Sequence, residues 1–201
     1  SDGTPEGTSK VFDLPQAIAS DEGGYGDPEA RLTAFGDGVF FFASADGSGA
    51  EAWLSDGTAP GTHVLRDIWP GPKGSAPDQG MPVAVDDQLY FTAEDPQHGI
   101  ELWTTDGTMS GTRLVHDVMP SGLGARVTGT VALDGKLVFT RDRTGAADGG
   151  GWGNGSVWQT DGTAAGTIEL SPPWTIHSPY APSVAGGRLY VFHPDQNENT
   201  N

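Results

Sequence analysis

The fold is decided by a ten-residue stretch, WTTDGTMSGT, at Trp103–Thr112. The pattern recurs as WLSDGTAPGT at Trp53–Thr62 and as WQTDGTAAGT at Trp158–Thr167, and a copy without its Trp, SDGTPEGT, occupies Ser1–Thr8. The Asp of the motif stands at positions 2, 56, 106 and 161, so successive copies are about fifty residues apart. A period of this length predicts an array of similar supersecondary units.

Between the copies, apolar and aromatic runs alternate with turn sequences. In the second interval, Pro82–Val85, Leu89–Ala93 and Ile100–Thr104 are expected to be strands, and Thr112–Val118 is expected to be a fourth. We call these four positions strands A, B, C and D. Short turns join them, so each unit is predicted to be an antiparallel meander. Asp106-Gly107 is expected to form its tightest hairpin, because Gly tolerates a positive φ.

Strand B is apolar on both faces in each unit, and such a strand is covered on both faces. A four-stranded sheet between two like sheets is a propeller blade. We therefore predict an all-β fold, a β-propeller of about four blade units, each with four antiparallel strands. The aligned strand B positions are Val39, Leu89, Leu137 and Leu189; Phe40, Tyr90, Val138 and Tyr190; and Phe41, Phe91, Phe139 and Val191.

The repeats make one array that covers the whole chain, residues 1–201. Its units lie near residues 1–55, 56–105, 106–160 and 161–201, and the last is incomplete. A loose strand D is expected after Ser1–Thr8, and strands A and B alone are expected in the last unit. Because an uncovered sheet edge exposes unpaired backbone groups, we expect the array to be part of a larger ring or to be completed by another chain.

The repeated Trp and Asp residues are expected to be structural. The strand C Trp residues should wedge between blades and bond their indole N–H groups to a neighbouring turn. The Asp residues admit two interpretations, a ladder of cation ligands or turn residues whose carboxylates accept N–H groups of their own turn, and the second is favoured. These structural repeat residues are Trp53, Trp103, Trp158, Asp56, Asp106 and Asp161.

Composition excludes several classes of function. The chain has 201 residues, a net charge of −17 and only 10 Lys and Arg, so the basic footprint that a nucleic-acid binder needs is missing. Binding to an anionic membrane surface is disfavoured for the same reason. With 0 Cys, the sequence offers neither disulfides nor thiolate metal sites. No apolar run approaches the length of a membrane span.

The residues Glu101–Thr108, followed by Gly111-Thr112 and Asp117, resemble the bacterial ELWxxDGT repeat family. The similarity covers nearly the whole chain and weakens in the third unit, where Ser156–Trp158 replaces Glu-Leu-Trp. Members of that family are typically secreted or attached to the bacterial surface. The resemblance implies a propeller-like array and a secreted, cell-surface or periplasmic location. It implies no established activity and supplies no catalytic residues.

Two insertions supply the candidate binding residues. Trp152 lies in a Gly-rich insertion between strands B and C of the third unit, and Tyr25 lies in an insertion of the first unit. An exposed aromatic of this kind either stacks on a sugar or anchors a protein partner, or it folds back onto its blade. Calcium has weak candidate ligands in acidic loops, at Asp21, Glu22, Asp27 and Asp46, although no EF-hand spacing is present.

The sequence therefore favours a non-enzymatic extracytoplasmic scaffold that binds a protein or glycan partner through blade-edge loops. No cofactor is expected. The alternative is a carbohydrate-active or other hydrolytic propeller enzyme with its site at the channel, and convergence of acids around one pocket would favour it. The acids that would have to converge are Asp21, Asp27, Asp46 and Asp148. The five histidines show no HExxH or HxH spacing, so turn or surface positions are expected for them.

Overall fold

The computed structural model describes residues 3–11, 32–45, 47–77, 82–118, 126–142, 155–170 and 182–191. The strands in these ranges are β1 (Thr33–Phe35), β2 (Gly38–Ala43), β3 (Glu51–Ser55), β4 (His63–Arg66), β5 (Val83–Val85), β6 (Gln88–Asp95), β7 (Gly99–Thr105), β8 (Arg113–Leu114), β9 (Arg126–Leu133), β10 (Lys136–Asp142), β11 (Gly155–Thr160), β12 (Ile168–Glu169), β13 (Ser183–Ala185) and β14 (Arg188–Tyr190).

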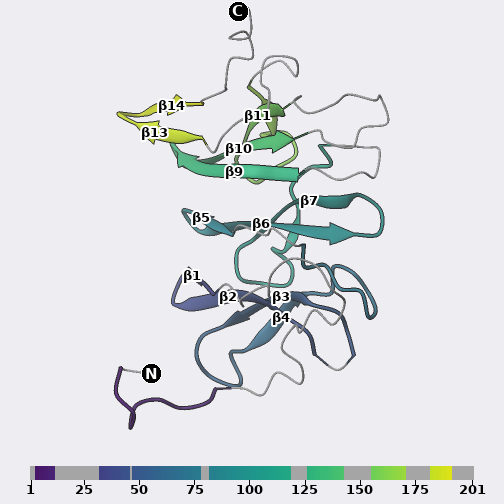
Figure 1. Ribbon diagram of the computed structural model, residues 1–201, viewed down its shortest axis with the longest axis vertical. Coiled ribbons are helices and arrows are strands. Elements are labelled where there is room, and N and C mark those ends of the chain that lie inside the picture. Colours follow the sequence, from purple (N-terminus) through teal and green to yellow (C-terminus); the bar gives the residue numbers. More distant parts are fainter. Residues whose placement is uncertain are drawn as a thin grey trace, which may run out of the picture.

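The strands form three four-stranded antiparallel sheets, in the orders β1-β2-β3-β4, β5-β6-β7-β8 and β9-β10-β11-β12, and one two-stranded sheet, β13-β14. Every strand pairs with its neighbour in the sequence, so each sheet is a simple meander. Figure 1 shows the sheets one above another along the long axis. The predicted all-β fold with propeller-type blades is confirmed, and within the described ranges the fourth blade has strands A and B.

The tightest hairpins lie between strands A and B. Two-residue turns join β5 to β6 and β9 to β10, and their first residues, Asp86 and Asp134, have φ values of 51° and 49°. Gly36 and Gly186 hold the same place with φ values of 56° and 57°. In the turns Asp134-Gly135 and Gly186-Gly187 both residues have a positive φ, as type I′ turns require. Asp106-Gly107 instead begins a seven-residue connection from β7 to β8, so the expectation of a tight hairpin there was wrong.

Strand D is shorter than the sequence suggested, and it is missing from residues 3–11, where a loose copy was expected. In the second sheet only Arg113–Leu114 is assigned as strand, although Val115 N still donates to Leu102 O at 3.0 Å. Beyond that point the chain turns away, and Val118 N donates to the side chain of Glu101 in strand C. That glutamate had been noted only as part of the family pattern.

The core lies between the sheets. Successive residues of a strand face opposite sides, so Phe40 of β2 packs toward the second sheet, against Phe91 at a ring distance of 5.0 Å. Tyr90 of β6 packs toward the third sheet in a cluster with Phe139. Val138 of β10 packs in turn against Leu189 and Val191 around β14. Each such buried large side chain contributes about 1.5–3 kcal/mol, so the stack is stabilised sheet by sheet.

The repeat motif joins two strands of the same sheet. It lies in the connection between strands C and D, so the sequence interval 56–105 contains strand D of the first sheet and strands A to C of the second. The repeat intervals and the sheets are therefore out of phase by one strand. Within the described residues, no helix has the length and apolar character needed to cross a bilayer.

Candidate functional site

The Asp-Gly-Thr connection of the second sheet is a closed hydrogen-bonded turn. The Asp106 carboxylate accepts both the backbone N–H and the hydroxyl of Thr108, at 2.9 and 2.7 Å through Oδ1. The Thr108 hydroxyl oxygen accepts the N–H of Gly111 at 3.0 Å. The Thr112 hydroxyl donates to Thr108 O at 2.7 Å and lies 2.8 Å from the Thr105 hydroxyl. The polar side chains of the motif thus bond to the turn itself.

The same bonds recur in the other copies. Asp56 and Asp161 accept from Thr58 and Thr163 at 2.7–2.9 Å. The incomplete first copy keeps part of the pattern, because Gly7 N donates to the Thr4 hydroxyl at 3.0 Å. We define the DGT turns as residues 56–62, 106–112 and 161–167. Since every one of these bonds joins residues no more than seven positions apart, the turn is encoded locally.

A glycine in each DGT turn leaves room for the carboxylate. A Cβ built on Gly111 would lie 2.0 Å from Asp106 Oδ1, and the same holds for Gly61 with Asp56. Gly107 has a φ of 90°, in the region that side-chain-bearing residues rarely adopt. The Asp-Gly-Thr-x-x-Gly-Thr spacing is therefore explained by the turn alone.

The hydrogen bonds also change the acidity of the motif. Bonds from the threonine hydroxyl and then from its backbone N–H lower the pKa of Asp56, Asp106 and Asp161. The three carboxylates are therefore ionised at neutral pH. Oδ1 of each carboxylate is occupied by its own turn, as expected for turn residues. Among the residues that the structure describes, no group of three or more His, Asp or Glu could hold a metal ion.

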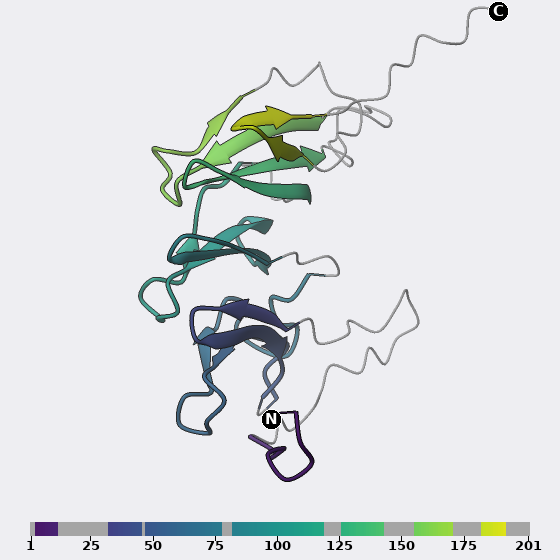
Figure 2. The same ribbon diagram turned by 90° about the vertical axis from the view of Figure 1, so that its left-hand side faces the viewer.

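At the tips of the DGT turns the Ala, Pro and Met side chains cannot join this network, whereas the Ser110 hydroxyl lies 3.2 Å from that of Thr108. The two positions between Thr and Gly are exposed in all three turns and differ in sequence. Met109 is 64% exposed, which is unusual for a large apolar side chain. Figure 2 shows the three turns following one another along one edge of the stack, at its left. The tip residues are Ala59-Pro60, Met109-Ser110 and Ala164-Ala165.

Arginine side chains tie the second and third DGT turns to the sheets before them. Arg66 of β4 donates to Thr112 O at 2.9 Å, and Arg113 of β8 donates to Gly162 O at 3.2 Å. Tyr90 adds to the second contact, because a Cβ on Gly162 would lie 3.0 Å from its hydroxyl. Burial, and then the charge of Asp161, raise the pKa of Tyr90. The spacing between successive turns is thus fixed by side chains as well as by the sheets.

Glu51, at the start of β3, is a buried clamp that sequence reasoning missed. Its carboxylate accepts the backbone N–H groups of Ile68 and Trp69 at 3.0 and 3.1 Å and the Ser75 hydroxyl at 2.5 Å. The side chain is 2% exposed. Burial raises the pKa of Glu51, while the three donors act in the opposite direction. The sequence did contain a signal for this clamp, because an acidic residue stands inside a strand whose neighbours are apolar on both faces. A carboxylate in that position is expected to be buried and hydrogen-bonded.

The clamp is repeated in the second sheet and replaced in the third. Glu101 is fully buried and accepts Val118 N at 3.4 Å, seventeen residues ahead as in the Glu51–Ile68 pair. Arg141 of β10 donates to the carbonyl of the same Val118 at 2.5 Å. In the third sheet Ser156 stands at the glutamate position. Its hydroxyl accepts the indole N–H of Trp158 at 2.8 Å.

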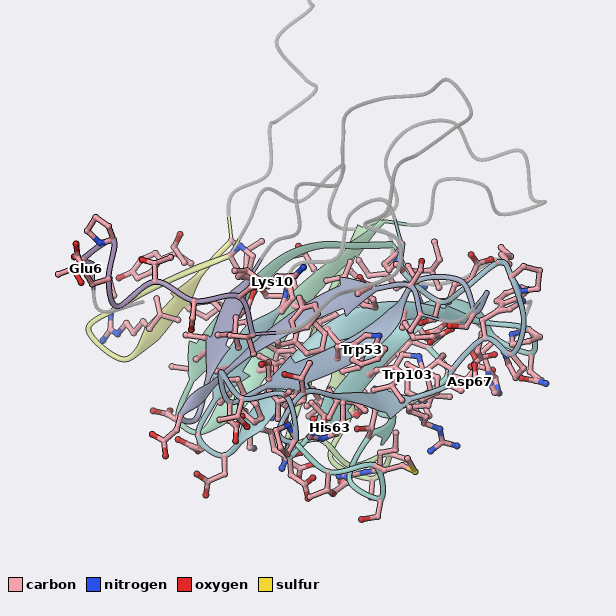
Figure 3. All side chains as sticks on the ribbon, turned by 90° about the horizontal axis from the view of Figure 1, so that it is seen from below. Glu6, Lys10, Trp53, His63, Asp67 and Trp103 are labelled. Atoms are coloured by element: carbon pink, nitrogen blue, oxygen red, sulfur yellow. The ribbon has the colours of Figure 1, made fainter. Side chains whose placement is uncertain are left out.

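The Trp column packs as expected, but its hydrogen bonds differ from the prediction. Trp103 and Trp158 join the clusters that contact the preceding sheet, and Trp53 stacks on Phe41 of its own sheet at 6.5 Å. Trp53 Nε1 donates to Ala43 O at 3.0 Å. Trp103 Nε1 makes no hydrogen bond within the described residues. The bonds of Trp53 to Ala43 and of Trp158 to Ser156 stay within their own sheets, because these two rings stack on strand B, on Phe41 and Phe139, with interplanar angles of 19° and 21°. Figure 3 looks along the stack from below, and in that view Trp53 and Trp103 project close to each other.

One histidine contacts a carboxylate. His98 Nδ1 lies 2.8 Å from Asp95 Oδ2 in the turn between β6 and β7, and Asp95 also accepts the N–H groups of Gln97 and His98. These bonds outweigh burial and lower the pKa of Asp95. His63 is exposed, and its Nδ1 lies 3.3 Å from Gly61 O. Both are turn or surface residues, as expected.

The candidate residues of the two insertions lie outside the described ranges. This holds for the binding candidates Trp152 and Tyr25, and for all the weak calcium candidates and proposed converging acids, which are Asp21, Glu22, Asp27, Asp46 and Asp148. A small cavity of about 10 Å³ lies between β6 and β9, lined by Tyr90, Thr92 and Val127 among others. That volume holds about one water molecule, so it does not accept an organic ligand.

Comparisons with known proteins give little further information. No family model matches the chain, and no curated protein sequence matches it significantly. Among solved structures, an alpha-L-arabinofuranosidase from Clostridium thermocellum is similar over 80% of this chain and 58% of that one, with 14% identity and a TM-score of 0.35. The chain thus spans a little over half the length of that enzyme. At this level of similarity nothing follows about activity.

Proposed function

We propose that this chain is a non-enzymatic, extracytoplasmic propeller scaffold that binds a protein or glycan partner through its blade-edge turns. The observation that supports this function is the contrast within each DGT turn between a fixed frame and a free tip. The frame is bonded to itself, whereas the tip residues are exposed and vary, as Met109-Ser110 and Ala164-Ala165 illustrate. Variable loops on a rigid framework are where proteins commonly place binding residues.

The charge of the turns limits the partner. Each DGT turn carries one carboxylate whose pKa is lowered, and the chain as a whole has a net charge of −17. A cationic protein surface or a neutral glycan is compatible with such an edge, while an anionic polymer is repelled. The Arg66 and Arg113 ties hold the turns at a fixed spacing, which favours a partner that contacts more than one turn.

A photo-crosslinking residue at position 110 tests whether the partner is a protein, because it would link a bound protein to the turn tip. The control carries the same residue at exposed position 87, in the A–B turn. Co-sedimentation of the chain with xylan, arabinan, chitin or peptidoglycan tests whether the partner is a glycan. We expect one protein or one glycan to be retained, and Met109→Ala to weaken that binding at least tenfold while leaving the melting temperature unchanged. Release of reducing ends from any of these polysaccharides would support the hydrolytic alternative. No partner in either arm would refute the proposal.

A further inference from the structure

The residue before the Asp of the repeat motif carries a hydroxyl group in every copy. The residues at this position are Ser1, Ser55, Thr105 and Thr160. The other Asp-Gly pairs of the sequence follow a glycine or an apolar residue, and the residues before them are Gly36, Ala45, Leu133 and Ala147. A hydroxyl thus precedes an Asp-Gly pair only within the repeat motif.

In the DGT turns this hydroxyl binds the amide of the glycine that follows the Asp. In the second turn Gly107 N donates to the Thr105 hydroxyl at 3.0 Å, and that hydroxyl lies 2.8 Å from the Thr112 hydroxyl. The first and third turns contain the same two contacts, at 2.7–3.1 Å. A hydroxyl has one hydrogen to donate, and Thr112 gives its own to Thr108 O. Thr105 therefore donates to Thr112 and accepts from Gly107.

This bond bears on the chemistry of the Asp-Gly pair. The glycine nitrogen can attack Cγ of the preceding Asp, and the amide hydrogen and the carboxyl hydroxyl group leave together as water, which gives a five-membered succinimide. Water then opens the ring at either carbonyl. Opening at the α-carbonyl leaves the chain running through the β-carboxyl group, as isoaspartate, with no net change in composition and no oxidation or reduction. Glycine favours the attack because no Cβ crowds the ring.

The DGT turn opposes this reaction at both reacting groups. The Gly107 nitrogen is held by its bond to the Thr105 hydroxyl, and the Asp106 carboxylate is bonded to Thr108, one residue further along. The bonds from Thr108 also lower the pKa of Asp106, which disfavours the neutral carboxyl group that must lose its hydroxyl. Both reacting groups must be released before the ring can close, so the reaction requires local opening of the turn.

The A–B turn of the third sheet contains the same dipeptide without these bonds. Asp134 and Gly135 are both exposed, with φ values of 49° and 70°. Leu133, before them, has no hydroxyl. The hairpin is closed by the pair Leu133↔Lys136, and within the described ranges the Gly135 N–H has no hydrogen-bond partner. The glycine nitrogen that would attack is therefore free at this turn.

We propose that Asp134-Gly135 is a site of spontaneous isoaspartate formation in the folded chain, and that the Ser or Thr before the Asp protects the DGT turns from the same modification. The hydroxyl protects by holding the glycine N–H. It thereby gives the motif position before the Asp a chemical role in addition to its part in the turn. This proposal concerns the stability of the covalent backbone, so it stands or falls independently of the proposed scaffold function.

The experiment follows isoaspartate in the folded chain during incubation in a mildly acidic buffer. Peptide mapping quantifies each site, because an isoaspartyl peptide elutes separately and resists a protease that cleaves before Asp. We expect isoaspartate at Asp134, and about tenfold less or lower at Asp56, Asp106 and Asp161, where the turn must open first. The same chain unfolded in urea is the control, and there all of these sites should react at similar rates.

Two variants test the hydroxyl itself. Thr105→Val removes the hydroxyl and nearly preserves the shape of the side chain, and it should raise isoaspartate formation at Asp106 about fivefold, as expected for the loss of one hydrogen bond. Asp56 should be unaffected. Ser55→Ala should have the opposite selectivity, raising the rate at Asp56 alone. Thr105→Ser restores the hydroxyl and should return Asp106 to the native rate. Melting temperatures establish that each variant is folded during the incubation.

Three results would overturn the proposal. The first is isomerisation at Asp106 as fast as at Asp134 in the folded native chain. The second is a folded chain without isoaspartate at Asp134 under conditions in which the unfolded chain forms it. The third is an unchanged rate at Asp106 in the folded Thr105→Val chain and at Asp56 in the folded Ser55→Ala chain, since the carboxylate bonds would then protect without the hydroxyl.

Discussion

Replacement of Glu51 by Ala should destabilise the stack more than any surface change. The substitution removes the acceptor of three hydrogen bonds, from Ile68 N, Trp69 N and the Ser75 hydroxyl. A buried donor left without an acceptor costs about 1–3 kcal/mol. Because neighbouring losses overlap and water reaches the half-buried Trp69, we expect a total of about 3–5 kcal/mol. For a chain of this size that lowers the melting temperature by roughly 10 °C.

The assay combines thermal unfolding with amide hydrogen exchange. Because an array of repeats can unfold in parts, exchange at Ile68 N–H reports on the clamp itself, and the melting temperature reports on the stack. Ser75→Ala is the matched control, since it removes one donor and leaves both backbone bonds to Glu51 in place. We expect the control to cost about 1 kcal/mol. A Glu51→Ala chain that melts within 2 °C of the native chain, or exchanges Ile68 N–H at the native rate, would refute the clamp.

Three further predictions follow from the turns and the carboxylates. Gly111→Ala should cost about 1–3 kcal/mol in a urea titration, because its Cβ would lie 2.0 Å from Asp106 Oδ1. The exposed neighbour variant Met109→Ala is the control, and equal stability of the two variants would contradict the turn geometry. The difference in unfolding free energy between the native chain and each of two carboxylate variants should change with pH, in opposite directions for the two. The pKa of Asp106 is lowered on folding, so its contribution is present above the ordinary value of 3.8 and lost as the pH falls; the gap in unfolding free energy between native and Asp106→Asn chains should narrow from pH 7 to pH 3.5. The pKa of Glu51 is raised, so the native chain loses stability as the pH rises from the ordinary value of 4.5 through the folded value; the gap between native and Glu51→Gln chains should widen on acidification, and a parallel response of both variants would contradict these pKa directions. Finally, a chelator should leave the melting temperature unchanged; an increase with added calcium would instead point to the acidic loops that contain Asp21, Glu22, Asp27 or Asp46.

The sequence predicts the sheets well because the apolar pattern that produces them repeats in every unit. The strand B columns repeat in every unit, and two apolar faces per strand permit only a strand covered on both sides. The A–B turns were also accessible from Asp86-Asp87 and Asp134-Gly135, although the tightest hairpin was assigned to the wrong connection. That error has a physical origin. An Asp-Gly pair is typical of a two-residue hairpin, but here the pair opens a longer turn that the following Thr and Gly residues close.

Side-chain partners were less predictable, because they depend on contacts made far along the chain. The Glu51 clamp joins β3 to a segment seventeen residues ahead, and this bond shortens strand D. The indole partners were mistaken for a similar reason. A Trp lying flat against strand B reaches the carbonyl of Ala43 in its own sheet before it reaches any turn. Binding candidates in the insertions have no repeat partner at all, so no periodic argument constrains Trp152 or Tyr25.

The motif contains two kinds of residue that act independently. Asp, Gly and Thr build the turn from local bonds, and the threonine bonds of the pattern recur at Thr4–Thr8. The glutamate of the motif instead binds backbone groups seventeen residues ahead. The third sheet shows that this glutamate can be replaced without loss of the turn. There Ser156 replaces the glutamate, yet the bonds of Asp161 are those of the other copies. Because turn and clamp are separable, residues at the turn tips can vary without disturbing the stack. A scaffold that presents different tips on one frame requires this separation.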